Sequence, residues 1–125
     1  MTKLTTDTKK TIIGIDYSLT SPAICINIDG ADILYFYYLT SKKKWTGQIS
    51  EDIEGNEHRE WKDPIERVKH ISDWAMGIIE SSISPYVYIE GYSYGSKGQA
   101  LFQIAENAGI LKYRLQEAKI PYEIV

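Results

Sequence analysis

The chain has 125 residues, 43% of them hydrophobic, which is enough for one domain with its own core. Its 14 basic and 17 acidic side chains give a net charge of −3, which excludes nucleic-acid binding through a global excess of positive charge. The single cysteine, Cys25, cannot form an intramolecular disulfide. The sequence also contains no run of about eighteen consecutive apolar residues, which a membrane-spanning helix would need. We expect one domain over residues 1–125, with a flexible N-terminal arm over 1–10, in the cytoplasm.

Three strands are predicted one after another at the start of the chain. Residues 11–16 and 22–28 are β-branched apolar runs, and the pair Asp29-Gly30 is typical of a tight turn between antiparallel strands. A third apolar run, residues 31–40, follows this turn directly. We therefore expect a three-stranded antiparallel unit.

The middle of the chain predicts a loop and then a helix. Residues 41–61 show no sustained hydrophobic period and mix charges of both signs, which predicts a long loop. In the predicted helix 63–83, Asp63 is the N-cap, Pro64 is the first helical residue, and Glu66 is placed for a capping box. The predicted core face of this helix consists of Ile65, Val68, Ile71, Ala75, Ile78 and Ile79.

A further strand, helix and strand complete the chain. Residues 86–90 are a short apolar run, and a Gly-, Ser- and Tyr-rich turn leads to a second helix that Ser96 and Gln99 can cap. The apolar face of this helix consists of Leu101, Ile104, Ala105, Ala108, Leu111 and Leu115. Residues 121–125 predict a fifth strand. The order βββαβαβ indicates an α/β fold with a five-stranded mixed sheet, in which the fourth strand is parallel to the first.

Two of the predicted strands end on a carboxylate. Asp16 ends the first strand and Glu90 ends the fourth, and open α/β sheets bind ligands at the carboxyl ends of their strands. Two neighbouring carboxylates repel one another unless they share a cation, and oxygen ligands favour Mg²⁺ or Mn²⁺. The alternative is that each acid caps a loop by accepting backbone N–H groups. The paired arrangement favours the metal site.

The motifs in this order resemble a known family. The strand and turn at 14–20 (GIDYSLT), the capped helix, and the segment 88–115 resemble the RuvC-type Holliday-junction resolvases of the RNase H-like superfamily, in particular small phage-borne forms. The likeness extends from residue 11 to the last residue. The first motif also resembles the phosphate-binding opening of sugar kinases and actin-like ATPases, and the segment 88–115 separates the two possibilities.

The resemblance implies a metal-dependent endonuclease that cleaves Holliday junctions and other branched DNA as a homodimer. It implies that Asp16 and Glu90 are catalytic ligands of Mg²⁺, with Mn²⁺ as a substitute. The family has two further acids on a helix after the fifth strand. Because the sequence ends at Val125, before any such helix, we expect a C-terminally truncated chain that is inactive by itself. A viral member of the family would act in the host cytoplasm.

Other residues near the predicted metal site are candidates for contacts with DNA. The turn 91–99 leads into a helix N-terminus, where phosphate can bind, and the resemblance implies an aromatic residue there at the junction centre. Both Tyr92 and Tyr94 fit that role, and structural packing of these tyrosines stays an alternative. The full candidate set is Tyr92, Tyr94, Ser96, Lys97, Lys42, Lys43 and Lys44. For the lysine run the alternative is simple solvation.

Several residues receive structural interpretations. Trp45 and Trp61 are candidates for anchoring the predicted loop rather than for contacts with a ligand, and His58 and His70 are too isolated to indicate a zinc site. Glu123 falls within the fifth predicted strand, which favours a solvent-facing residue over a metal ligand.

The second predicted helix also has an apolar set away from its core face. These residues, Phe102, Ile110 and Tyr113, are the candidate homodimer contact. Two other functions stay open. One is a non-catalytic RNase H-like module that binds nucleic acid or serves in assembly. The other is half of an actin-like or sugar-kinase fold, which would need a second lobe to enclose a nucleotide.

Overall fold

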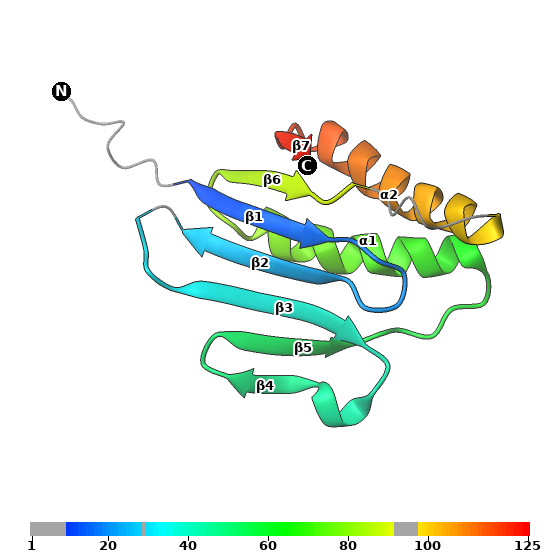
Figure 1. The fold of residues 1–125 in the computed structure, drawn as a ribbon, viewed down its shortest axis with the longest axis horizontal. Helices are drawn as coiled ribbons and strands as arrows, with labels where there is room; N and C mark the ends of the chain where they lie inside the picture. Colours follow the sequence, from blue (N-terminus) through cyan, green and yellow to red (C-terminus); the bar gives the residue numbers. More distant parts are fainter. Residues whose placement is uncertain (1–9, 29, 92–97) are drawn as a thin grey trace.

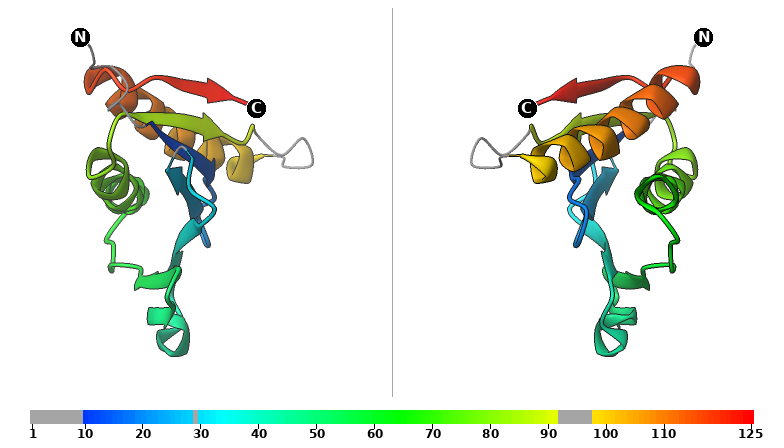
Figure 2. Two further views of the ribbon diagram at one scale, coloured as in Figure 1. Left: turned by 90° about the vertical axis from the view of Figure 1, so that its left-hand side faces the viewer. Right: turned by 90° about the vertical axis from the view of Figure 1, so that its right-hand side faces the viewer.

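A mixed sheet carries two long helices on one of its faces (Figures 1 and 2). The computed structural model describes residues 10–28, 30–91 and 98–125, and the predicted N-terminal arm lies almost wholly outside them. In chain order the elements are β1 (Thr11–Asp16), β2 (Ala23–Ile28), β3 (Leu34–Thr40), the short 3₁₀ turn η2 (Lys43–Trp45), β4 (Gly47–Ser50), β5 (Ile53–Glu57), α1 (Pro64–Glu80), β6 (Pro85–Ile89), α2 (Gln99–Glu117) and β7 (Tyr122–Ile124). This architecture confirms the predicted α/β fold class.

The strands lie in the order β4-β5-β3-β2-β1-β6-β7. As predicted, β2 is antiparallel to both β1 and β3, and β6 is parallel to β1. In addition, β5 is parallel to β3, and β7 is parallel to β6. The C-termini of β1, β3, β5, β6 and β7 therefore lie at the same end of the sheet, which we call its carboxyl end (Figure 1).

The prediction of five strands is wrong, because the sheet formed by the described residues has seven. The segment 41–61, predicted as a loop, contains β4 and β5. In β5, Ile53 pairs with Phe36 of β3, and Gly55 pairs with Tyr38. Backbone hydrogen bonds to β3 hold this polar segment in the sheet. Its sequence does not alternate between apolar and polar residues, so no hydrophobic pattern predicts the strand.

The connection between β2 and β3 is also longer than predicted. β3 begins at Leu34 rather than at residue 31, so the Asp29-Gly30 pair is not a two-residue hairpin turn. Gly30 has a φ of +83°, a conformation that favours glycine, and Asp29 lies outside the described residues.

The core lies between the inner face of the sheet and the two helices (Figure 2). Its buried side chains from the sheet are Ile13, Ile15, Ile24, Ile26, Leu39, Val87 and Ile89, and those from the helices are Ile71, Ala75, Met76, Ile79, Leu111 and Leu115. Both helices extend at their N-termini beyond the strands (Figure 1). For this reason Ile65 and Leu101, both predicted to be core residues, are 61% and 36% exposed. Within the described residues, no helix is long and apolar enough to cross a membrane.

The two helices begin differently. In α1, the Asp63 carboxylate accepts a hydrogen bond from the backbone N–H of Glu66 at 2.8 Å, and the Glu66 carboxylate accepts one from the backbone N–H of Lys62 at 3.2 Å. The predicted N-cap of α1 is therefore confirmed. In α2, the N-cap is Gly98, with φ +65° and no side-chain cap. The predicted cap, Ser96, lies outside the described residues and is not the residue at which the helix starts.

A polar contact joins the two helices. The Arg114 guanidinium donates to Ser72 Oγ at 2.8 Å and to Asp73 Oδ1 at 2.6 Å, and Lys69 Nζ binds the other Asp73 oxygen at 2.7 Å. Burial acts to raise the pKa of Asp73, but hydrogen bonds from Lys69 and Arg114, together with their charges, lower this pKa by more. Asp73 is thus held as a carboxylate that fixes α2 on α1.

Gly55 offers a test of the two unpredicted strands. A Cβ at this position would overlap the Trp45 carbonyl and lie 2.6 Å from the Tyr38 ring, whose hydroxyl donates a hydrogen bond to that same carbonyl. We expect Gly55→Ala to lower the free energy of unfolding by about 1–3 kcal/mol, because overpacking forces neighbouring groups apart. Urea denaturation measures this difference.

Gly77→Ala is the matched control. Gly77 is exposed in α1, and an added Cβ there meets nothing within 4 Å. This variant should gain about 0.5–1 kcal/mol from helix propensity. Equal stability of the two alanine variants would contradict the close packing around Gly55.

Candidate metal and nucleic-acid site

The pairing of β1 with β6 brings two carboxylates together at the carboxyl end of the sheet. Asp16 is the last residue of β1, and Glu90 directly follows β6. The Glu90 backbone N–H donates to the Ile15 carbonyl at 3.0 Å, so the hydrogen-bond ladder continues up to Glu90. Both acids are exposed. The structure therefore places the two predicted ligands at the ends of adjacent parallel strands.

Asp16 and Glu90 line the same cavity, whose volume is about 450 Å³. The other lining residues come from the β1–β2 turn, the end of β6 and α2, and they are Tyr17, Ser18, Leu19, Thr20, Ile89, Gly91, Gln103, Ile104 and Ala108. Cavities of about 300–1,000 Å³ with a mostly apolar lining and a few polar groups are typical ligand sites. This cavity has that character, with its carboxylates at the strand ends.

Tyr17 anchors the chain immediately after Asp16. Its side chain is only 7% exposed, and burial raises the pKa of its hydroxyl above the ordinary value. Within the described part of the chain, this hydroxyl has no hydrogen-bond partner. Because Tyr17 is buried next to an exposed Asp16, the backbone is held with the carboxylate on the outside.

The turn between β1 and β2 is held in place from another part of the chain. His58 Nε2 lies 2.8 Å from the Thr20 carbonyl, and the Arg67 guanidinium donates to the Leu19 carbonyl at 3.1 Å. From the sequence, His58 is too isolated to indicate a zinc site, and no sequence pattern points to Arg67. Neither contact has a sequence signal, because the partners are 38 and 48 positions apart.

The chemistry of these groups fits a hard divalent cation. Among the described residues, neither the Asp16 nor the Glu90 carboxylate forms an ion pair, and no group of three or more His, Cys, Asp or Glu side chains could hold a metal. Mg²⁺ commonly binds proteins through one or two carboxylates and keeps several water molecules. A site with two carboxylates at an open cavity suits that mode of binding.

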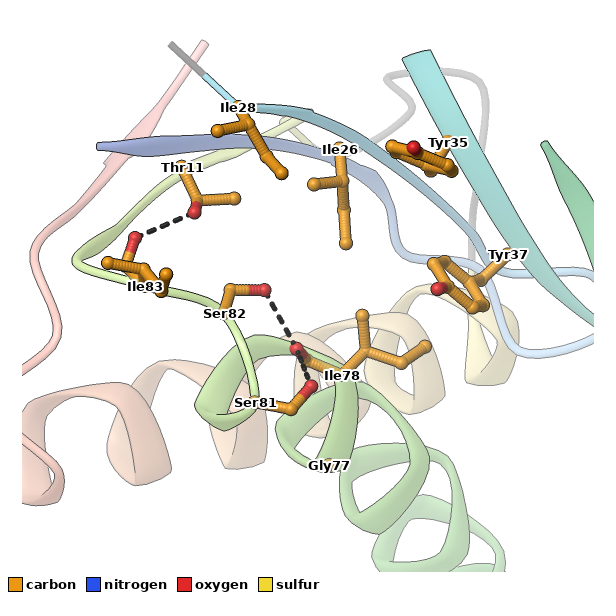
Figure 3. A pocket seen from close by; sticks show the side chains of 10 residues that line it. All are labelled: Thr11, Ile26, Ile28, Tyr35, Tyr37, Gly77, Ile78, Ser81, Ser82 and Ile83. Atoms are coloured by element: carbon orange, nitrogen blue, oxygen red, sulfur yellow. Dashed lines mark hydrogen bonds between the residues drawn. The ribbon is translucent and has the colours of Figure 1, made fainter. Parts of the chain in front are cut away.

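A second cavity, of about 420 Å³, lies at the opposite end of the sheet (Figure 3). It lies between the sheet and the C-terminal end of α1, and its lining is mainly apolar. Three of its hydroxyl groups are used internally, because Thr11 Oγ1 donates to the Ile83 carbonyl, and both Ser81 Oγ and Ser82 Oγ donate to the Ile78 carbonyl. This cavity therefore offers fewer free polar groups than the one at Asp16 and Glu90.

The other predicted site residues are only partly described. Lys42, Lys43 and Lys44 are exposed after β3, at the carboxyl end of the sheet, and β2 separates β3 from β1. Tyr92, Tyr94, Ser96 and Lys97 lie outside the described residues. Glu123 is exposed in β7 and accepts a hydrogen bond from the Tyr86 hydroxyl at 2.7 Å, as expected of a solvent-facing strand residue.

Solved structures of RuvC are similar in fold to this chain. The structure of Thermus thermophilus RuvC in complex with a Holliday junction substrate matches with a TM-score of 0.62 and 12% sequence identity, covering 93% of this chain and 64% of that one. A second Thermus thermophilus RuvC structure matches with a TM-score of 0.58 and 13% identity, covering 92% and 63%. This chain thus spans about 64% of the length of the first RuvC chain.

Other comparisons add little. A structure of the Aquifex aeolicus PPX-GPPA enzyme has a TM-score of only 0.40 at 15% identity, and it covers 94% of this chain and 36% of that one. No family model and no curated protein matches the sequence. At the observed identities, the similarity to RuvC establishes an RNase H-like, RuvC-type fold, while the phage resemblance and the cytoplasmic location stay predictions.

A substitution at Asp16 tests the metal site. We expect Asp16→Asn to weaken Mn²⁺ binding by about tenfold or more, since even the loss of a group that supports a metal ligand commonly costs that much. Thermal stability should hardly change, because the Asp16 side chain is exposed. Electron paramagnetic resonance titration with Mn²⁺ measures the affinity.

Glu51→Gln is the control for this experiment. Glu51 is an exposed acid between β4 and β5, at the opposite end of the sheet, and its loss should leave Mn²⁺ binding unchanged. If both variants bind Mn²⁺ as tightly as the unmodified chain, Asp16 is not a metal ligand.

Proposed function

We propose that this chain is the metal-binding part of an endonuclease that cleaves phosphodiester bonds in branched DNA, in particular four-way junctions. One observation carries the proposal: on an RNase H-like fold, Asp16 and Glu90 line one cavity at the ends of adjacent parallel strands. The RuvC neighbour was solved with a Holliday junction substrate, which supports the choice of DNA.

In this proposal, Asp16 and Glu90 hold Mg²⁺, for which Mn²⁺ can substitute. When bound, the cation supplies positive charge that stabilises negative charge developing on the phosphate oxygens. Tyr17 keeps the Asp16 backbone in position, and Ile89, Ile104 and Ala108 give the cavity an apolar wall that limits access of water. The Asp16 and Glu90 carboxylates also repel DNA unless a cation is present, so binding of the phosphate is coupled to binding of the metal.

Contacts away from the metal are assigned to positive and aromatic residues. Because the net charge is −3, attraction of DNA has to come from local groups, and the exposed run Lys42, Lys43 and Lys44 is a candidate for the backbone of one DNA arm. The turn with Tyr92, Tyr94, Ser96 and Lys97 joins Glu90 to α2 in the sequence, which keeps these four residues as candidates for the junction centre.

Localised oxidative cleavage tests whether the metal and the DNA branch point meet at Asp16 and Glu90. Fe²⁺ replaces Mg²⁺ and, with ascorbate and peroxide, cuts DNA close to the bound ion. We expect cuts near the crossover of a synthetic four-way junction, and we expect Asp16→Asn to lose these cuts while its junction binding in a gel-shift assay is retained. Glu51→Gln should behave like the unmodified chain.

The outcomes of this assay separate the functions under consideration. Equal affinity for junction and linear duplex, or oxidative cuts that persist in Asp16→Asn, would contradict the proposal. Junction binding without any metal-directed cuts would favour a non-catalytic binding module. Hydrolytic nicking by these 125 residues with Mg²⁺ or Mn²⁺, which the family resemblance does not lead us to expect, would indicate that Asp16 and Glu90 suffice for catalysis.

We also propose that the protein acts as a homodimer through the exposed face of α2. Phe102 and Tyr113 are 69% and 62% exposed, and Ile110 is 36% exposed on the same helix. Symmetric cleavage of a four-way junction requires two matched sites, which two-fold symmetry supplies. Sedimentation should detect a dimer at tens of micromolar, and Phe102→Asp should dissociate it.

Ile33→Asp serves as the control, because Ile33 is 53% exposed before β3, away from α2. This variant should remain dimeric. A chain that sediments only as a monomer at that concentration contradicts the α2 interface.

A further inference from the structure

His58, Trp61 and Arg67 form a cluster, which we call the tryptophan cluster, at the carboxyl end of the sheet. The Trp61 side chain is 43% exposed, yet its ring is held by two neighbours. The Arg67 guanidinium lies over the ring, 4.6 Å from its centroid, and the His58 ring contacts Trp61 edge-on with centroids 6.2 Å apart. An exposed aromatic ring is thus kept in one orientation by a cation–π contact and an edge contact.

The tryptophan cluster is connected to the Asp16–Glu90 cavity. His58 and Arg67 are the same side chains that bind the carbonyls of Thr20 and Leu19, in the turn that follows Asp16. A small cavity lined by Trp61 and Arg67 shares Leu19 and Gln103 with the Asp16–Glu90 cavity. Trp61 therefore borders the site at which the phosphate is proposed to bind.

The charges around Trp61 favour a contact with a base over a contact with phosphate. The cavities beside the cluster are lined by three acids, Asp63, Glu66 and Glu106, and by two cations, Arg67 and Lys69. Both cations are engaged elsewhere, because Arg67 binds the Leu19 carbonyl and the Trp61 ring and Lys69 binds Asp73. The excess of carboxylates therefore disfavours phosphate groups. A nucleobase carries no charge at neutral pH and has a flat π face that stacks on an indole ring. Stacking on the ring is therefore the interaction that this surface favours.

We propose that Trp61 is a stacking platform for an unpaired nucleobase of the DNA strand whose phosphate binds at Asp16 and Glu90. The proposal rests on the proposed function and adds a residue that selects branched over linear DNA. In a linear duplex each base is already stacked and paired, so the ring gains little. At a branch point, an unpaired base can turn outward onto Trp61 without the loss of base pairing and stacking that a base in a duplex would suffer.

Binding of a forked DNA with one unpaired 2-aminopurine at its branch point tests the platform, since the fluorescence of this base is quenched when it stacks. With Mg²⁺ present, we expect quenching by the unmodified chain. Trp61→Leu should lose the quenching and bind the fork roughly tenfold more weakly, which is in the range for one lost stacked base. Trp61→Phe, which keeps a smaller ring, should retain part of both effects.

Trp45→Leu is the matched control. Trp45 is 49% exposed with Lys44 Nζ 5.4 Å from its ring centroid, but it lies next to β4 and β5, beyond β3 in the sheet. This variant should quench and bind like the unmodified chain. Affinity for linear duplex should be the same in all variants.

Binding of Mn²⁺ distinguishes stacking from a structural role. Trp61→Leu loses the contacts with Arg67 and His58 and so lowers the melting temperature in either case. If Trp61 only braced the β1–β2 turn, this variant would also weaken Mn²⁺ binding, whereas a stacking platform leaves Mn²⁺ binding unchanged. Retained quenching in Trp61→Leu, or an equal loss of affinity for fork and duplex, would overturn the platform. An unmodified chain with no preference for forked DNA would instead count against the proposed function itself.

Discussion

The parallel pairing of β1 with β6 is the interaction on which the rest of the structure depends. Ile13 and Val87, paired in register, are both fully buried, and the ladder extends to the hydrogen bond between the Glu90 N–H and the Ile15 carbonyl. Parallel neighbours need a long crossover connection, and β2 to β5 together with α1 lie between these two strands in the sequence. The same pairing thus positions α1 against the sheet and brings two distant acids together.

The cavity at Asp16 and Glu90 also depends on contacts that hold α2 and the β1–β2 turn in place. Arg114 joins α2 to Ser72 and Asp73 of α1, and α2 supplies one wall of the cavity at Asp16 and Glu90. On the other side, the tryptophan cluster holds the β1–β2 turn through two backbone carbonyls. Rigid support from both sides suits the proposed binding of a cation and a phosphate next to two carboxylates that repel each other.

The sequence patterns predicted the helices and strands that depend on interactions between residues close together in the chain. The N-cap at Asp63, the helical repeat that buries Ile71 and Ile79, and the strand that ends at Asp16 are all short-range features, and the structure has them. The two strands in 41–61 were missed because their stability comes from pairing with β3, and Ile65 was misplaced because α1 begins beyond the sheet. The bracing of the turn after Asp16 joins positions far apart in the sequence, and no short-range pattern encodes such a contact.

The alternation of side chains along β1 determines which sequence changes leave the candidate site intact. Ile13, Ile15 and Tyr17 face the core, and because successive side chains of a strand point to opposite faces, Asp16 lies on the outer face. Replacing one apolar residue by another preserves this alternation. Inserting or deleting one residue in β1 would instead exchange the two faces and bury the acid. Apolar substitutions that keep the length of β1 therefore leave Asp16 on the outer face, and a fold similar to that of RuvC is compatible with 12% sequence identity.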